Sequence, residues 1–578
     1  MRKRYLSKKA FIFRARIVLT FFLVIFFLLL WRFYDLQIIK HDYYLSKAER
    51  QYSYSSQYYD RGSIYFQNKD KTLFSVADIK TSHTLAIVPK LMKKSELDSI
   101  YNFLNKDAGL KISKKTFYRK AALKDDPYEE LVRGVDDKTA EIILSKKFKG
   151  VILPKYRFRF YPANSMASQL IGFVAQNAHD NGMHGRYGLE KYYDKELFKD
   201  PQKLGINFFA ELFGDIKKIA NGDFSDNGSL VTSIEPSVQM QLEKVLERTY
   251  KKWHSKRVSA IVYDPNSGEI VAMGSYPNFD LNHFSKVEST EIYENPLVEN
   301  VYEMGSIVKA ITVASGLDSG VIRENETYYD SGCKVYDSSR ICNYDKRARH
   351  TVPVQEILSQ SLNVGAAWVY EQMGKKRFKS YFDKLGLTDI SGVDLPNEAE
   401  PLVGNLNSPR DIEFATASFG QGVAFSPIAM VRALGALGTG YIRIPHIVKY
   451  IKKDSGIMVN LAPKDDAERV YKDSTVESIS RMLVEVVDKK LANGKRKKEH
   501  YTVAAKTGTA EISRMGAYEK GIYNHTFFGY FPAFKPRFVL LFVNERPHGA
   551  KYASQTLTDP FYEMVDFLIN YYNIEPDR

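Results

Sequence analysis

The chain has 578 residues, too many for one compact core, and at roughly 150 residues per domain it predicts two to four folding units. With 44% hydrophobic and 26% charged residues it has the composition of an ordinary globular protein, which excludes long disorder over most of its length. The net charge of +15 is compatible with nucleic-acid binding. However, the sequence contains no nucleic-acid-binding motif, and we expect no nucleic-acid partner. Nearly half of the excess lies in the first sixteen residues, which hold no acidic residue and seven basic ones: Arg2, Lys3, Arg4, Lys8, Lys9, Arg14 and Arg16.

An uncharged, strongly apolar run follows this basic segment. Residues 17–31 read IVLTFFLVIFFLLLW, and with their apolar flanks they could form a helix across a bilayer core, which needs about 20 residues. A cleaved signal peptide is disfavoured because Arg32 and Phe33 follow in place of small residues. The sequence therefore predicts a basic cytoplasmic tail over residues 1–16 and one transmembrane anchor over residues 17–40. The charge asymmetry indicates that the rest of the chain is exported.

Residues 41–230 form the next predicted unit. They mix short apolar strands with lysine-rich helical stretches and contain no metal or phosphate motif. A turn at Asn227-Gly228 leads into a predicted strand, 229–234, and an amphipathic helix, 237–250. We place the main domain boundary at residue 230.

The second half, residues 231–578, has strands at both ends and helices between them. Segments 258–263 and 270–273 flank a turn rich in Pro, Asn and Gly and predict a β-hairpin. Segments 306–320 and 355–372 have helical periodicity. Three late segments read as strands: 502–509, 526–531 and 538–543. This order predicts an α+β domain in which early and late strands share one sheet with helices packed on it.

The chain has two cysteines, Cys333 and Cys342, in a loop-like stretch. In an oxidising compartment they could form a disulfide worth roughly 2–3 kcal/mol, and two free thiols are the alternative. Their number and spacing do not suggest a zinc site. No metal or cofactor is expected.

Ser306 and Lys309 are the first candidate catalytic pair. Ser306 follows Gly305 at the start of the helical segment, and Lys309 lies one turn on, on the same face. A serine hydroxyl is a weak nucleophile until a base takes its proton, and a lysine can serve as that base if burial and neighbouring cations keep it neutral. A second S-x-x-K match, Ser331 to Lys334, lies in a loop rich in Gly, Asp and Ser, and we interpret it as a coincidence.

Two later elements select between these matches. Ser361-Leu362-Asn363 lies at the turn of a helical segment, and Lys506-Thr507-Gly508-Thr509 lies on a late strand. Singly, each has an ordinary explanation as a helix cap, a turn or a strand lysine. Jointly and in this order after Ser306, they resemble the S-x-x-K, S-x-N and K-T-G triplet of the penicillin-recognising serine enzymes.

Further motifs narrow the resemblance to class B penicillin-binding proteins, the monofunctional peptidoglycan D,D-transpeptidases. Residues 302–306 are similar to their entry to the catalytic helix, with Met304 in place of proline. Residues 417–422 are similar to their Gly-Gln-Gly loop. Three earlier stretches, at 61–64, 159–162 and 188–190, resemble their pedestal motifs, although residues 66–69 depart from the family pattern.

The resemblance implies a fold with three parts: one transmembrane helix, an extended mixed α/β pedestal or dimerisation-type domain, and a transpeptidase domain whose antiparallel sheet has helices on both faces. It implies a stem peptide ending in D-alanyl-D-alanine as the substrate, β-lactams as ligands and a serine ester as the intermediate. Ser306, Lys309, Ser361, Asn363 and Lys506 would be catalytic. The predicted substrate-binding residues are Thr507, Gly508 and Thr509.

The resemblance also sets expectations for location and partners. The ectodomain would lie outside the cell membrane, with the N-terminus in the cytoplasm. Since the glutamate-rich glycosyltransferase signature of bifunctional relatives is absent, we expect a membrane-embedded glycosyltransferase and divisome proteins as partners. Residues 294–303 and 536–544 look more similar to division-type than to elongation-type members.

The sequence disfavours two rival functions. A β-lactam hydrolase or sensor is disfavoured because no E-x-x-L-N sequence supplies a deacylating glutamate, and because Asn363 stands where oxacillinase-type enzymes and sensors carry valine. A non-catalytic scaffold of a cell-wall complex is disfavoured because every catalytic position is intact.

Overall fold

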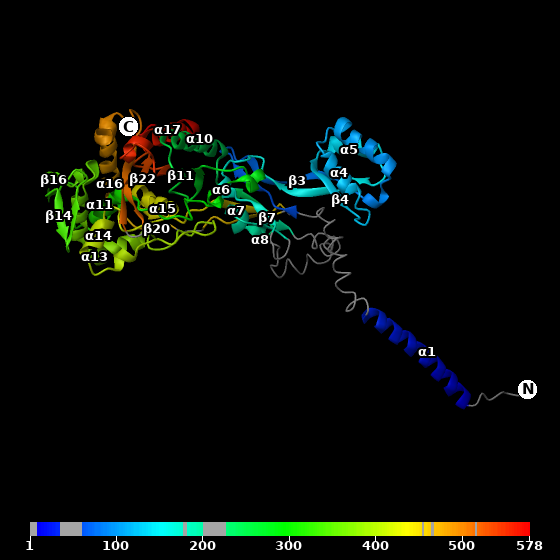
Figure 1. Ribbon diagram of the computed structural model, residues 1–578. Helices are drawn as coiled ribbons and strands as arrows, with labels where there is room; N and C mark the ends of the chain where they lie inside the picture. The colour runs from blue at the N-terminus through cyan, green and yellow to red at the C-terminus, as the bar shows by residue number, and fades with distance from the viewer. Residues whose placement is uncertain are drawn as a thin grey trace, which may run out of the picture. The chain divides into compact units, whose positions relative to one another are not determined.

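The computed structural model describes residues 8–34, 60–176, 182–199, 227–453, 456–463, 467–514 and 517–578 (Figure 1). Residues 1–7 of the predicted basic tail and residues 35–40 of the predicted anchor lie outside these ranges. The chain divides into two compact units. The smaller comprises Met1–Asp60, Lys80–Phe158 and Pro201–Gly205, and the larger comprises Arg61–Ile79, Arg159–Asp200 and Ile206–Arg578.

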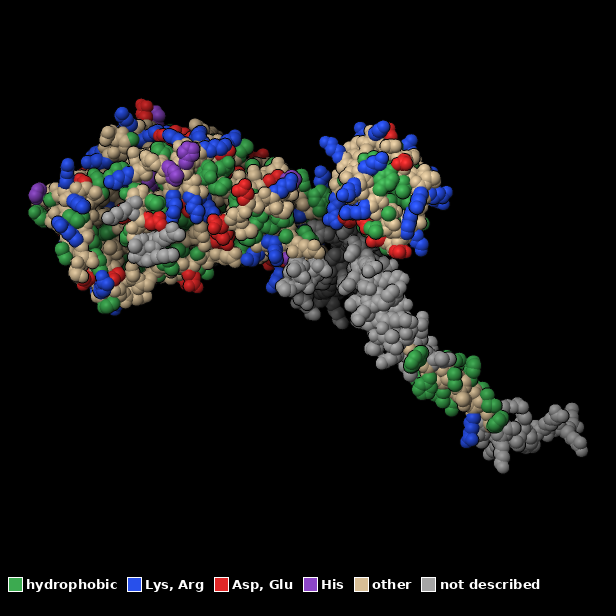
Figure 2. All heavy atoms as spheres, in the orientation of Figure 1, with side chains coloured by type: hydrophobic (Ala, Val, Ile, Leu, Met, Phe, Trp, Pro, Cys, Tyr) green, Lys and Arg blue, Asp and Glu red, His purple; other side chains and the backbone are tan. Residues whose placement is uncertain are grey.

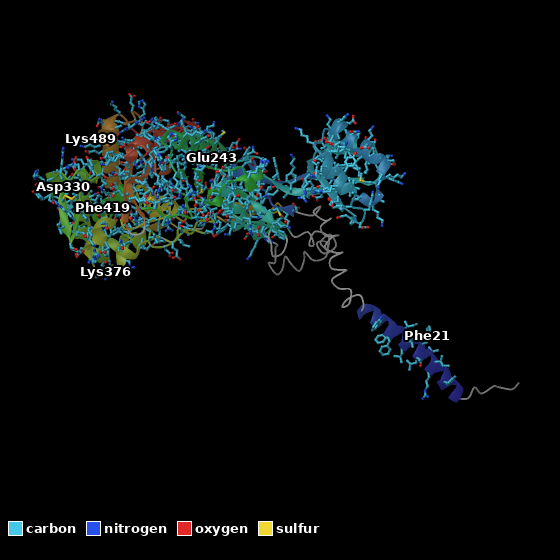
Figure 3. The ribbon with its side chains drawn as sticks, viewed as in Figure 1. Phe21, Glu243, Asp330, Lys376, Phe419 and Lys489 are labelled. Atoms are coloured by element: carbon cyan, nitrogen blue, oxygen red, sulfur yellow. A yellow bond between two sulfur atoms is a disulfide. The ribbon has the colours of Figure 1, made fainter. Side chains whose placement is uncertain are left out.

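Helix α1 (Lys8–Tyr34) contains the apolar run near the N-terminus. Hydrophobic side chains gather along it in Figure 2, and Phe21, which Figure 3 labels, is 61% exposed. Within the described ranges, no helix has both the length and the apolar window that crossing a membrane requires. The anchor over residues 17–40 stays a prediction.

The smaller unit has its own hydrophobic core. Strands β4 (Glu129–Val135) and β5 (Val151–Ile152) both pair with the last residues of β3 (Leu73–Ile87). Three helices, α3 (Leu97–Asn102), α4 (Lys114–Ala121) and α5 (Asp137–Ser145), supply apolar residues to the same core, such as Ile100, Phe117 and Ile143. This packing gives residues 80–158 a separate core, which agrees with their assignment to one compact unit.

The larger unit is built on a five-stranded antiparallel sheet with the order β12-β11-β23-β22-β21. The predicted hairpin is present as β11 (Arg257–Tyr263) and β12 (Ile270–Tyr276), and β11 pairs next with β23 (Phe538–Glu545). The two other late strands are β21 (Ala504–Arg514) and β22 (Ala517–Phe531). Early and late strands therefore share one sheet, as the sequence predicts.

Both faces of this sheet are covered because its strands are apolar on both sides. In β11, Val258, Ala260 and Val262 pack into one core, whereas Ile261 and Tyr263 pack into the other, the period of two that a pleated strand imposes. The first core lies under α10 (Pro236–Trp253) and α17 (Ala553–Tyr572). The second is formed with five further helices: α11 (Val308–Asp318), α13 (Asn363–Lys384), α14 (Asp411–Ala417), α15 (Pro427–Thr439) and α16 (Asp473–Glu485).

A second sheet joins sequence-distant parts of the larger unit. Strand β10 (Gly228–Thr232) pairs in parallel with β2 (Ile64–Gln67) and antiparallel with β18 (Val448–Lys453). Next to β18 lies β19 (Met458–Asn460). Because β10 bonds to strands from both halves of the chain, residues on either side of the boundary predicted at 230 belong to one compact unit.

The three pedestal stretches converge on one buried ion cluster. Glu190, from α7 (Gly188–Tyr192), accepts hydrogen bonds from Arg61 Nε at 2.7 Å and from Arg159 Nε at 2.6 Å. The Glu190 side chain and that of Arg61 have no solvent exposure, and Arg159 also donates to the Gly62 carbonyl oxygen at 2.8 Å. Asp194 gives Arg61 a second carboxylate at 2.8 Å. Charges buried this deeply are tolerated only when paired in this way.

We predict that Glu190→Gln destabilises the larger unit by about 3–5 kcal/mol, because it leaves Arg159 buried without an anionic partner. Urea unfolding followed by tryptophan fluorescence measures the change as a lower midpoint. Glu247→Gln is the matched control, since Glu247 pairs with Lys251 at the surface and should change the midpoint little. Equal midpoints for Glu190→Gln and the wild type would show that the buried cluster does not stabilise the fold.

Candidate active site

Ser306 lies in a tight turn that leads into α11. The turn is a short 3-10 segment, Gly305–Ile307, and Gly305 has a φ of +59°, a conformation that favours glycine. A Cβ at Gly305 would lie 2.8 Å from the Thr509 carbonyl oxygen, so the absent side chain also lets the turn approach β21. Met304, which stands where the resemblance expects proline, is fully buried, and its carbonyl oxygen accepts a hydrogen bond from Thr526 Oγ1 at 2.8 Å. These contacts hold the turn without a proline.

Lys309 joins the predicted catalytic residues. Its Nζ lies 3.0 Å from Ser306 Oγ, 3.1 Å from Ser361 Oγ, 2.7 Å from the Ser361 carbonyl oxygen and 2.7 Å from Asn363 Oδ1. Its side chain is fully buried, and the ring of Phe419, labelled in Figure 3, has its centroid 5.9 Å from Nζ. One amine therefore joins Ser306 to Ser361 and Asn363, which lie more than fifty residues further along the chain.

Burial makes this lysine a candidate base. Desolvation, with a further contribution from the nearby Lys506 charge, holds the pKa of Lys309 well below its ordinary value. A neutral amine at 3.0 Å can accept the proton of the Ser306 hydroxyl. The arrangement can thus generate a serine nucleophile without a histidine.

Ser361 and Asn363 stand at the start of α13. Ser361 has a φ of +57°, which is strained for a residue with a side chain, and this conformation aims both its oxygens at Lys309. The Asn363 amide is oriented at both ends, since Oδ1 accepts from Lys309 and Nδ2 donates to the Cys342 carbonyl oxygen at 2.9 Å. The second Nδ2 hydrogen remains for a ligand.

The Cys342 contact gives the two cysteines a structural role. They form a disulfide, resolving the alternative that the sequence left open, and they face each other in the pair of β14 (Cys333–Tyr336) and β15 (Ser339–Cys342). Asn343, the next residue, donates from Nδ2 to buried Asp330, and its Oδ1 accepts from the Val364 N–H. The hairpin is therefore fastened to the first turn of α13.

The Lys-Thr-Gly-Thr stretch lies on β21. Lys506 Nζ is 3.2 Å from Ser361 Oγ, and burial lowers the pKa of Lys506 to about 8. A Cβ on Gly508 would lie 2.3 Å from Thr526 Oγ1 and 2.5 Å from the Met304 carbonyl oxygen, so only glycine fits. Thr509 Oγ1 accepts from the Ala553 N–H at 3.1 Å, which leaves its own hydrogen free to donate.

These residues open onto a cleft of about 520 Å³. Ser306, Ser361, Asn363, Thr507 and Thr509 line it, whereas Lys309, Lys506 and Gly508 lie behind its wall. The sequence reading missed several other lining residues: Tyr344, Glu511, Tyr523, Lys551, Tyr552 and Ser554. Because side chains alternate between the two faces of a strand, Glu511 could have been predicted to share a face with Thr507 and Thr509, which it follows at a spacing of two residues. The others carry no local motif.

The second S-x-x-K match is not a catalytic pair. Ser331 Oγ donates to the Cys333 carbonyl oxygen at 2.8 Å, and Lys334 Nζ pairs with Glu371 at 2.6 Å. Both groups are exposed, so neither lies in the desolvated surroundings that Lys309 has. Its interpretation as a coincidence agrees with this geometry.

Comparison with known proteins gives two family matches. The family model described as the penicillin binding protein transpeptidase domain matches residues 258–565, and the penicillin-binding protein dimerisation domain matches residues 56–199. Stage V sporulation protein D of Bacillus subtilis is 27% identical over 562 residues, covering 95% of this chain and 84% of its own. The peptidoglycan D,D-transpeptidase FtsI of Escherichia coli is 28% identical over 455 residues, covering 77% of this chain and 73% of its own.

Solved structures show the same fold. Penicillin-binding protein 2X of Streptococcus thermophilus superposes with a TM-score of 0.72 at 18% identity, covering 89% of this chain and 79% of that one. Penicillin-binding protein 3 of Mycobacterium tuberculosis, in complex with aztreonam, superposes with a TM-score of 0.63 at 22% identity. The match covers 73% of this chain and 92% of that one. Both similarities support a two-domain architecture of mixed α and β structure.

The two lysines predict a distinctive pH dependence for acylation of Ser306 by benzylpenicillin. Lys309 should lose its proton while Lys506 is still charged, because the Lys506 charge is one cause of its depressed pKa. The rate constant should therefore fall above about pH 8, where Lys506 loses the charge that attracts the ligand carboxylate. Stopped-flow acylation across pH 6–10 gives the profile.

Lys506→Arg tests this assignment, since a guanidinium keeps its charge throughout this range and should move the alkaline decline upward by at least about one pH unit. Lys551→Arg, in the same cleft, is the control and should leave the decline in place. An unchanged decline in Lys506→Arg would show that another group titrates.

Proposed function

The chain belongs to the penicillin-binding proteins, and from this premise we propose that it is a membrane-anchored peptidoglycan D,D-transpeptidase that works through an acyl-enzyme on Ser306. The observation that carries the proposal is the buried Lys309 amine, 3.0 Å from the Ser306 hydroxyl and in contact with Ser361 and Asn363. The substrate is a stem peptide ending in D-alanyl-D-alanine. Acyl transfer to an amine then cross-links two stems.

In the first step Ser306 Oγ attacks the carbonyl carbon of the penultimate D-alanine while Lys309 takes its proton. The negative charge that develops on the carbonyl oxygen is held by the backbone N–H groups of Ser306 and Thr509. Loss of one such donor costs about 100-fold to 1,000-fold in comparable enzymes. Their placement is supported by the close approach of the Gly305 turn to Thr509.

The leaving D-alanine needs a proton on its nitrogen. Ser361 Oγ lies 3.1 Å from Lys309 Nζ and 3.2 Å from Lys506 Nζ, so it can pass a proton from the Lys309 side to the substrate. Collapse of the tetrahedral intermediate then breaks the peptide bond and leaves the ester. Asn363 orients the substrate amide through the Nδ2 hydrogen that Cys342 does not use.

The terminal carboxylate of the substrate is held at β21. The hydroxyls of Thr507 and Thr509 donate to it, and the Lys506 cation adds attraction. In the second step a side-chain amine of a neighbouring stem peptide attacks the ester, its proton returns through the same groups, and Ser306 regains its hydrogen. β-Lactams occupy the donor position and acylate the same hydroxyl.

The location and partners belong to the same proposal. The apolar residues of α1, the basic residues before them and the similarity to FtsI support a single-pass anchor, an ectodomain outside the cell membrane and a role in septal wall synthesis. Since the enzyme would cross-link strands that another enzyme polymerises, its partners are a membrane-embedded glycosyltransferase and divisome proteins. Residues 41–230 and 231–578 are proposed as the pedestal and transpeptidase domains.

We predict that a fluorescent penicillin labels the wild-type chain and that Ser306→Ala abolishes the label, since no ester can form. Ser331→Ala is the matched control and should keep full labelling, because Ser331 lies in the unrelated loop. In-gel fluorescence after denaturation measures the covalent adduct. Absence of label on folded wild-type protein would refute the enzyme assignment, and rapid turnover of penicillin would favour a hydrolase.

We also predict that a fluorescent fusion to the full chain collects at midcell and stays with the membrane fraction after alkaline carbonate extraction. A fusion that begins at residue 41, exported by a cleaved signal sequence, should be released by the same extraction. A fusion spread along the side wall would contradict the septal role, and release of the full chain would contradict the anchor.

A further inference from the structure

Glu511 extends the row of cleft-facing side chains on β21. Alternate residues of a strand share one face, so Thr507, Thr509 and Glu511 point the same way, with successive members about 6.8 Å apart. All three line the cleft that contains Ser306. The row therefore runs from two hydroxyls to one carboxylate.

No side chain of the described residues forms a hydrogen bond or an ion pair with the Glu511 carboxylate. It is half-buried, and Tyr523 lies directly opposite on β22 and lines the same cleft. Because directly paired residues share a face of the sheet, the tyrosine ring and the carboxylate border the same space.

Glu511 also lines a second hollow of about 340 Å³ beside the cleft. Glu303 lines it too, and its carboxylate accepts from the Gly422 N–H at 3.0 Å and from Tyr518 at 3.2 Å. Burial raises the pKa of Glu303. The hollow is lined by no lysine or arginine of the described ranges. This end of the cleft is thus suited to a cation.

The proposed function fixes the direction of a bound donor peptide. Its C-terminal carboxylate lies at Thr507 and Thr509, and its penultimate carbonyl lies at Ser306, so the residue before these two lies further along β21, toward Glu511. Acceptor stems attack through a side-chain amine, and donor stems of the same wall carry the same residue. The donor therefore brings an ammonium group to this part of the cleft.

We propose that Glu511 is a specificity residue that binds the side-chain ammonium of the donor stem peptide, an inference that rests on the proposed function. The carboxylate supplies a charge-assisted hydrogen bond, and the Tyr523 ring adds a cation–π contact. Lys551 also lines the cleft, and its Nζ lies 5.3 Å from the centroid of the Tyr552 ring. Because Lys551 is itself a cation, it does not attract the ammonium group. Glu511 would act on binding, with no part in the bond changes.

Two synthetic penicillins test this, one with a 6-aminohexanoyl side chain and one with the isosteric heptanoyl chain. Both acylate Ser306, and only the first carries an ammonium group where the donor residue would lie. On the full chain in detergent, we expect the ammonium compound to react roughly threefold to tenfold faster. Glu511→Gln should remove this preference while the heptanoyl rate stays unchanged, and Glu511→Lys should reverse it.

Glu519→Gln is the matched control, since it removes one charge from the adjacent strand outside the cleft and should keep the preference. Equal rates of the two penicillins on the wild type would overturn the inference, as would a preference that survives Glu511→Gln or falls equally in Glu519→Gln. Failure of both penicillins to acylate the wild type would instead refute the proposed function and the inference together. An unchanged heptanoyl rate in each variant shows that the variant is folded.

Discussion

The site is organised around one constraint, which is the burial of the Lys309 amine. An ammonium group with no solvent exposure is costly, so every position around it must offer oxygen atoms, and Ser306, Ser361 and Asn363 supply four of them. The same burial lowers the pKa of Lys309, which suits it to the role of base that we propose. The contacts around Lys309 and its proposed reactivity thus both depend on the desolvation of its nitrogen.

Three elements must meet for that burial to occur, and each is fixed by a different device. The turn at Gly305 approaches β21 because neither Gly305 nor Gly508 has a side chain to obstruct it. The start of α13 is held by the disulfide hairpin through Cys342 and Asn343. Strand β21 is held by its pairing with β22 and by the bond from Ala553 to Thr509. The cleft is the space that these three supports leave open.

A second buried charge cluster fixes the region that precedes the transpeptidase domain. Arg61, Arg159 and Glu190 come from three separate stretches, and their mutual hydrogen bonds require the three backbones to pack together. Since β10 bonds to strands on either side of it in sequence, this region and the main sheet form one compact unit. Burial thus lowers the pKa of an amine at the first place and requires closely paired charges at the second.

The sequence by itself determined the main hairpin, the late strands and the order of Ser306, Lys309, Ser361, Asn363 and Lys506, because periodicity and motif spacing are local properties. It predicted one helical segment over residues 355–372, whereas the structure breaks that segment at Ser361, with its positive φ, into α12 (Gln355–Ser359) and α13. It could not decide whether Cys333 and Cys342 pair, because that depends on two strands meeting. It also missed Tyr344, Glu511 and Lys551, which reach the cleft from a turn, a strand and a loop with no shared motif. Only the tertiary structure brought these side chains to Ser306 and buried Lys309 among them, since desolvation is a property of the packed molecule and of no segment alone.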